Sequence, residues 1–104
     1  MDIITTPYPV SLKVFSDISE FKEAYKELNN KDADIVGCLG MFSHNDCDLI
    51  IGVFNNDVVT LVHELSHAVM YIFDTVGIPL SSDNSETYCY YMDSLLKQAK
   101  AILI

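Results

Sequence analysis

The chain has 104 residues, half of them hydrophobic, and a formal net charge of −9. This length predicts one domain over residues 1–104, with a single modest core and no separate substrate domain. Nucleic acid and anionic membranes are bound through basic patches, which an acidic chain of this kind lacks. We therefore expect no nucleic-acid partner and no membrane partner.

The N-terminus and the cysteines predict a cytoplasmic protein. Met1–Thr5 carries an acid where a secretory signal peptide would be basic, and no apolar run of membrane-spanning length follows. The three cysteines, Cys38, Cys47 and Cys89, form no C-x-x-C pair, and one of them must remain unpaired. They fall in apolar strand-like or helix-like runs, so we expect buried free thiols in a reducing compartment.

The N-terminal third predicts a strand followed by a helix. Polar and apolar residues alternate from Val10 to Phe15, as in a half-buried strand. Ser16 or Asp17 can then cap a helix that continues to about Leu28. Its apolar residues recur at helical spacing, and its charged residues form a solvated outer face.

The middle of the chain predicts an antiparallel hairpin. Two apolar runs of β-type residues, Ile35–Phe42 and Asp48–Phe54, flank the polar segment Ser43–Asp46, which has the composition of a turn. His44 is expected in that turn, where a histidine is most simply solvated, although a role toward a substrate or transition state stays open.

Two helices are predicted after the hairpin. The first covers Val58–Val76, is capped by Asn55–Asp57, and is ended by Gly77 and Pro79. One apolar stripe along it is expected to face the core, consisting of Val58, Leu61, Val62, Leu65, Val69, Ile72, Phe73 and Val76. The last helix covers about Asn84–Ile102.

The order of elements is therefore β-α-β-β-α-α, which predicts an α+β fold. The natural architecture is a small antiparallel or mixed sheet with helices packed on one face.

The predicted helix over Val58–Val76 contains the sequence H-E-x-x-H, with His63, Glu64 and His67 as its fixed residues. Positions i and i+4 of a helix lie one above the other, so both imidazoles point the same way. Two imidazoles at this spacing can bind one Zn²⁺, and the glutamate beside them can take a proton from a bound water. This pattern predicts a zinc site with Glu64 as general base.

A catalytic zinc ion usually has three protein ligands and one open position. Because the loop after Gly77 is short, the last helix returns alongside the motif helix, and Glu86 in its first turn could reach the ion. Glu86 could instead cap its own helix, since Asp83 and Glu86 have capping-box spacing. Asp83, Cys89 and Asp93 remain weaker substitutes as the third ligand, and Asp74 is expected at the surface.

These features resemble the gluzincin metallopeptidases, above all the short minigluzincins and similar small H-E-x-x-H proteins encoded by bacteriophages. The resemblance is carried by His63–Val69, Val76–Pro79 and Asn84–Tyr91. It implies that His63, His67 and Glu86 bind the metal and that Glu64 is the general base. Many gluzincins carry an aspartate four residues after the glutamate ligand, where this chain has Tyr90.

The resemblance implies a zinc-dependent hydrolase, most simply a peptidase acting on a peptide or protein substrate. Glu64 would accept a proton as water attacks a carbonyl and would pass it to the leaving amine. Tyr90 could donate a hydrogen bond to the developing oxyanion.

The alternative is a phage or mobile-element interaction or inhibitor protein that contains zinc but does not cleave peptides. The short chain and the acidic surface favour this alternative, and the intact Glu64 favours the enzyme.

Overall fold

The computed structural model describes residues 1–104 as an α+β fold of one mixed sheet and three α-helices. In chain order, the elements are β1 (Asp2–Ile3), β2 (Ser11–Phe15), α1 (Ile18–Asn29), β3 (Gly40–Asn45), β4 (Asp48–Val53), α2 (Val58–Val76), the short 3₁₀ helix η1 (Ser82–Asn84), α3 (Ser85–Ala99) and a second 3₁₀ helix, η2 (Lys100–Ile102). The predicted order is confirmed, with β1 as an additional strand.

The sheet has the strand order β1-β2-β4-β3. β2 and β4 run parallel, whereas β1 pairs with β2 and β3 pairs with β4 in antiparallel register. In β2, Leu12 and Val14 are buried while Ser11 and Lys13 are exposed, which matches the predicted alternation. The two outer strands, β1 and β3, are the edges, so β3 has one free side.

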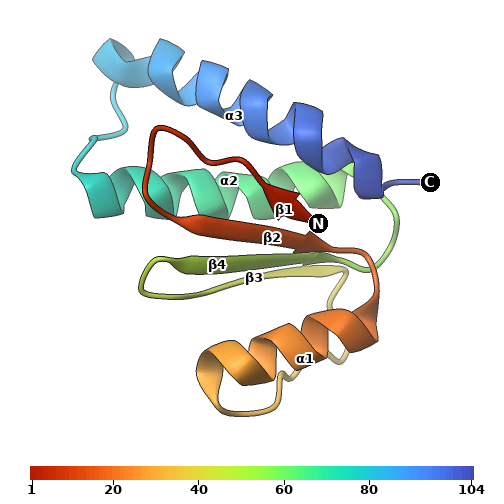
Figure 1. The fold of residues 1–104 in the computed structure, drawn as a ribbon. Coiled ribbons are helices and arrows are strands. Elements are labelled where there is room, and N and C mark those ends of the chain that lie inside the picture. Colours follow the sequence, from red (N-terminus) through yellow and green to blue (C-terminus); the bar gives the residue numbers. More distant parts are fainter.

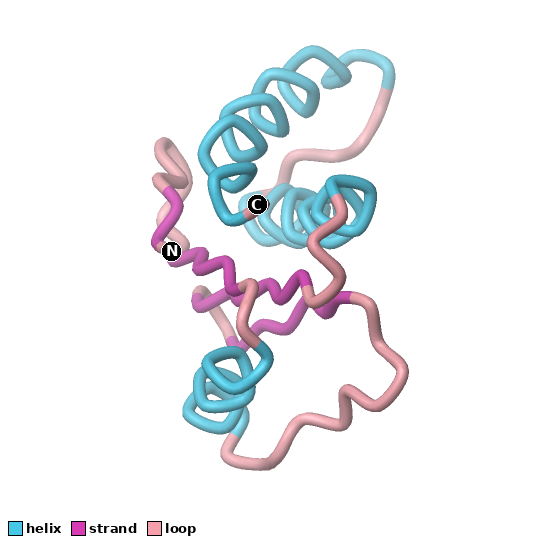
Figure 2. The backbone as a smooth tube through the Cα atoms, turned by 90° about the vertical axis from the view of Figure 1, so that its right-hand side faces the viewer, coloured by secondary structure: helices cyan, strands magenta, loops and turns pink.

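Helices cover both faces of this sheet (Figure 1). α1 lies on one face, and α2 lies on the other with α3 stacked against it, an arrangement that the turned view also shows (Figure 2). The prediction that the helices pack on one face is therefore wrong. The reason lies in β4, which is buried from Leu49 to Val53 and so must be covered on both faces.

α1 covers its face of the sheet through one aromatic cluster. Phe21 is fully buried and packs edge-on against Phe15 and Phe54, with ring centroids 6.2 Å and 5.4 Å apart. Asp17 caps the helix by accepting a hydrogen bond from the Glu20 N–H, as one of the two predicted caps. Asn30 ends it in the left-handed conformation.

The hairpin is antiparallel as predicted, but its bounds differ. β3 begins at Gly40 rather than near Ile35, and its two-residue connection to β4 is Asp46-Cys47 rather than Ser43–Asp46. Asp46 has a φ of 55°, a conformation that short polar residues such as aspartate tolerate in tight turns. His44 consequently lies on an edge strand and not in a turn.

The bounds of α2 agree with the prediction, and both of its ends are capped. Asp57 accepts a hydrogen bond from the Val59 N–H at 2.8 Å. Gly77 has a φ of 80° and ends the helix, with its own N–H and that of Ile78 bonded back to the carbonyls of Asp74 and Phe73. The predicted apolar stripe is buried except at three positions: Val58 and Val62 are exposed, and Val76 is half-buried.

α3 packs on α2 and also holds the N-terminal segment. Tyr91 is buried and donates a hydrogen bond to the Thr5 carbonyl at 2.8 Å. The Gln98 side chain makes two hydrogen bonds with the backbone of Ile4, one as acceptor and one as donor. These hydrogen bonds fix the segment directly after β1 beside the helix.

The cysteines depart from the prediction. Cys38, Cys47 and Cys89 are free, as expected, but all three are exposed. Cys38 and Cys47 lie in the loop and the tight turn of the hairpin region rather than inside strands, so the apolar runs around them do not bury them.

No helix combines the length and the apolar character needed to span a lipid bilayer.

Candidate metal centre

α2 brings the three motif side chains together. The donor atoms of His63, Glu64 and His67 all lie within 4.8 Å of one another. The two imidazole rings are 4.9 Å apart and nearly perpendicular. Both histidines are exposed, and neither imidazole makes a hydrogen bond within the chain, so the ring nitrogens are available to a ligand. This group could hold a metal ion.

Glu64 differs from the two histidines because it is buried, with 7% of its surface exposed. It faces β3 at Gly40, where a Cβ would lie 2.6 Å from the Thr60 methyl group and 3.2 Å from Glu64 Cγ. Only glycine therefore lets β3 approach α2 this closely. Burial raises the pKa of the Glu64 carboxyl group, and the neighbouring His63 and His67 partly offset that rise.

Aromatic side chains of β3 and α2 flank His67. The Phe42 ring lies nearly parallel to the His67 ring, at 6.3 Å between centroids and 13° between planes. His44, also on β3, stacks on Tyr71 at 3.9 Å. Tyr71 in turn donates a hydrogen bond to the Asp46 carbonyl at 2.7 Å, which ties α2 to the hairpin turn. Phe42 therefore packs beside His67 on the side of β3, and Tyr71 fixes the hairpin near it.

A hollow of about 310 Å³ adjoins the motif. Its lining consists of Leu39, Gly40, Val59, Thr60, His63 and Glu64. The hollow lies between the start of β3 and the first half of α2, so a molecule in it would contact both the exposed imidazole and the buried carboxyl group.

Glu86 is not part of this group. It lies in the first turn of α3 and is exposed, and the cluster of donor atoms contains only the three motif residues. Asp83, Cys89 and Asp93, the weaker substitutes, are likewise exposed and outside the cluster. Ligation by Glu86 stays a prediction from the resemblance, without support from the geometry.

Tyr90 also lies away from any polar partner. It is 69% exposed and makes no hydrogen bond within the chain. The buried tyrosine of α3 is its neighbour Tyr91. A role for Tyr90 toward an oxyanion stays a prediction. Asp74 is exposed near the end of α2, as expected.

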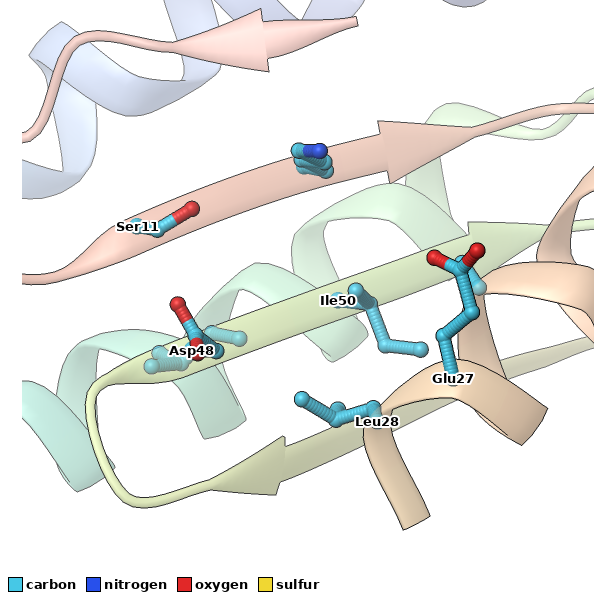
Figure 3. Close-up of a pocket in the computed structure, with 8 residues that line it drawn as sticks. Ser11, Glu27, Leu28, Asp48 and Ile50 are labelled. Carbon is cyan, nitrogen blue, oxygen red and sulfur yellow. The ribbon is translucent and has the colours of Figure 1, made fainter. Parts of the chain in front are cut away.

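A second hollow, of about 270 Å³, lies on the opposite face of the sheet. Figure 3 shows Ser11, Asp48 and Ile50 from the strands and Glu27 and Leu28 from α1 around it. The lining also includes Lys13 but no histidine and no cysteine. This hollow therefore offers no imidazole or thiolate ligand, and it lies across the sheet from the motif.

Sequence reasoning identified the three clustered residues but missed those that shape the site. Gly40 and Thr60 set the approach of β3 to α2, and Phe42 and Tyr71 pack beside the histidines. Gly40 begins a β-type run next to other small residues, which is a weak signal of close backbone approach. The aromatic contacts depend on the register of the hairpin, and the predicted bounds of the hairpin were wrong.

The donor set defines what the centre can do chemically. Two imidazoles suit zinc and several other divalent transition metals, and a glutamate beside them can bind the ion or exchange a proton next to it. With no third side chain brought in by another element, the remaining coordination positions would be open to water or to another molecule. No protein-family model matches this chain, and no curated protein and no solved structure matches it either.

Proposed function

We propose that the protein is a zinc-dependent hydrolase that cleaves peptide bonds, with His63 and His67 as zinc ligands and Glu64 as general base. One observation carries the proposal: Glu64 is 7% exposed, has a carboxylate oxygen within 4.8 Å of a ring nitrogen of each histidine, and makes no side-chain hydrogen bond within the chain. Its carboxyl oxygens are not fully buried, because the group lines the adjoining hollow, but its partial desolvation costs stability. A carboxyl group in this position can exchange a proton with water at a bound metal.

The donor set fits zinc, because imidazole nitrogen is a common zinc ligand and the two rings lie on one helix face. When bound, Zn²⁺ acts as a Lewis acid that makes water a nucleophile near neutral pH and polarises a carbonyl group. The two imidazoles can hold the ion only in their neutral form, so binding weakens as the pH falls and they take up protons.

Glu64 performs the proton transfers. It takes a proton from the water whose oxygen forms a bond to the carbonyl carbon, and it later gives that proton to the amine nitrogen as the C–N bond breaks. Burial favours this role, because a raised pKa makes the carboxylate a stronger base. The hollow bounded by Leu39, Gly40 and Val59 would receive the substrate beside it.

A second candidate function has its own supporting observation. The chain brings only two histidines to the ion, and Glu86 lies outside the cluster. A zinc-containing interaction protein needs no complete catalytic ligand set, so this observation favours it. The unpartnered Glu64 argues the other way, because a purely structural metal site has no use for a buried base.

The deciding experiment compares Glu64→Gln with the matched change Glu23→Gln, on the exposed side of α1. Zinc content is measured on both variants, and cleavage of a mixed peptide library is followed with and without a chelator. We expect full zinc in both, and a loss of turnover of roughly 10²-fold or more in Glu64→Gln alone, the scale for removing a general base. Cleavage that survives Glu64→Gln excludes the mechanism, and zinc-loaded wild-type protein without cleavage favours the interaction protein.

A further inference from the structure

The solvent-facing side of α2 is unusual for a surface helix. Val59, Val62 and Met70 are 71%, 37% and 49% exposed, and His63 and His67 lie among them. The outer face of such a helix normally carries charged residues. α2 has only two, Glu64 and Asp74, and Glu64 is buried. An apolar and nearly uncharged face of this kind marks an interaction site.

The spacing of this face matches that of paired helices. Val59, His63, Ser66 and Met70 follow one another at intervals of four, three and four residues. This 3.5-residue repeat is the seam of two helices that pack along each other. Ser66, in the middle, is small, and its hydroxyl already donates to the Val62 carbonyl at 2.8 Å. It therefore permits close approach and requires no new polar partner.

Charge indicates which partner fits this seam. The chain has a net charge of −9, so two copies repel each other over most of their surface. The repulsion is smallest where the seam of one copy meets the seam of the other, because the seam residues carry no acid. A strongly basic partner would instead find its complement on the acidic remainder of the surface.

The metal donors provide the second argument for a second copy. Zinc in a closed site takes four ligands, and each chain exposes two unpartnered imidazoles, His63 in the seam and His67 next to it. We propose that two copies of the chain pair through Val59, His63, Ser66 and Met70, and that one Zn²⁺ is held between them by His63 and His67 of both copies. A two-fold pairing supplies the missing ligands, because each copy contributes the same pair.

This pairing regulates the site of the proposed function. In the pair, four imidazoles occupy the ion and leave no position for a water molecule, so hydrolysis belongs to the single chain, and cleavage is assayed at a dilution at which the chains do not pair. The inference rests on the same metal binding by His63 and His67 as the proposed function, but it does not rest on hydrolysis. Zinc content and molecular mass can therefore test it separately from activity.

The test is sedimentation velocity of the full chain with Zn²⁺ and with a chelator, together with the zinc content. We expect twice the 11.7 kDa of one chain and one zinc ion for every two chains, reverting to single chains when the chelator is added. Met70→Glu places a charge in the seam without removing a ligand, and should weaken pairing at least about tenfold. The matched control Ile18→Glu changes an exposed apolar residue at the start of α1 and should pair normally.

Three results would overturn the inference. The first is a single chain that binds one zinc ion and does not pair, which leaves the proposed hydrolase intact. The second is a pair that survives both the chelator and Met70→Glu, which places the contact elsewhere. The third is the absence of zinc binding, which removes the proposed function as well.

Discussion

The polar side chains on the two flanks of α2 differ in their hydrogen bonding. On the flank toward α3 and β1, Tyr91 and Gln98 each bond to the backbone of the N-terminal segment. On the flank toward β3, His63, Glu64 and His67 lie together without one hydrogen bond among their side chains and the rest of the chain. Polar groups that bond to one another stabilise a fold, whereas groups without a partner in the chain are free to bind water or a ligand.

Tyr91→Phe should destabilise the fold on the hydrogen-bonded flank toward α3 and β1. The change removes one of the two hydrogen bonds that the Thr5 carbonyl accepts, and leaves the one from the Tyr8 N–H. We expect the free energy of unfolding to fall by about 0.5–1.5 kcal/mol, the net value of one hydrogen bond, measured by urea denaturation near neutral pH. Tyr90→Phe, at an exposed neighbour with no such bond, is the matched control and should change stability little.

Tyr91 also makes the stability of the fold depend on pH. Burial, with a smaller contribution from Tyr8, raises the pKa of Tyr91 from 10.0 to about 12. The folded state therefore favours the neutral phenol, so this stabilisation is complete below pH 10 and is lost as the pH rises toward 12. Wild-type protein should lose more stability over this interval than Tyr91→Phe, and equal losses would contradict the assignment.

Glu64→Gln, on the flank toward β3, should raise the free energy of unfolding instead of lowering it. Burial of the Glu64 carboxylate costs stability, since desolvation raises its pKa above 4.5. In metal-free protein with chelator, we expect the neutral amide to raise the free energy of unfolding by about 0.5–1 kcal/mol at pH 7. The gain should disappear below pH 4.5, where the wild-type carboxyl group is also neutral. Destabilisation at pH 7 would show that Glu64 serves the fold.

The contrast between the flanks also explains what the sequence could predict. The caps Asp57 and Gly77 and the helical spacing of His63 and His67 are local, so α2 and its motif follow from nearby residues. The hairpin bounds failed because the apolar run Ile35–Leu39 resembles a strand, yet Val36 and Leu39 stay exposed in the loop. The prediction that α1 packs on the same face as the other helices was wrong, because the burial of β4 on both faces depends on its central position in the sheet.

Tyr91 and Glu86 show the same limit on α3. Both lie on one predicted helix, but which of its faces meets α2 depends on how the two helices pack. The capping-box spacing of Asp83 and Glu86 suggested a competing role at the start of the helix, and no side-chain cap forms there. The sequence therefore predicted the helix and not the direction in which Glu86 points.

Glu86→Ala gives the smallest expected effect and the sharpest test of the resemblance. Because Glu86 is exposed and outside the donor cluster, removing its carboxylate should change zinc affinity by less than about threefold, the size of a screened surface charge. His67→Ala is the positive control, since losing one of two imidazoles should weaken binding by about 100-fold or more. Titration of each variant with Zn²⁺ by calorimetry measures both. A loss with Glu86→Ala as large as with His67→Ala would mean that α3 turns its first turn toward the ion when metal binds, and that the gluzincin ligand set holds in this chain. An unchanged affinity would leave His63, Glu64 and His67 as the whole of this chain's own metal centre, and the remaining ligands would have to come from water, substrate or a second copy.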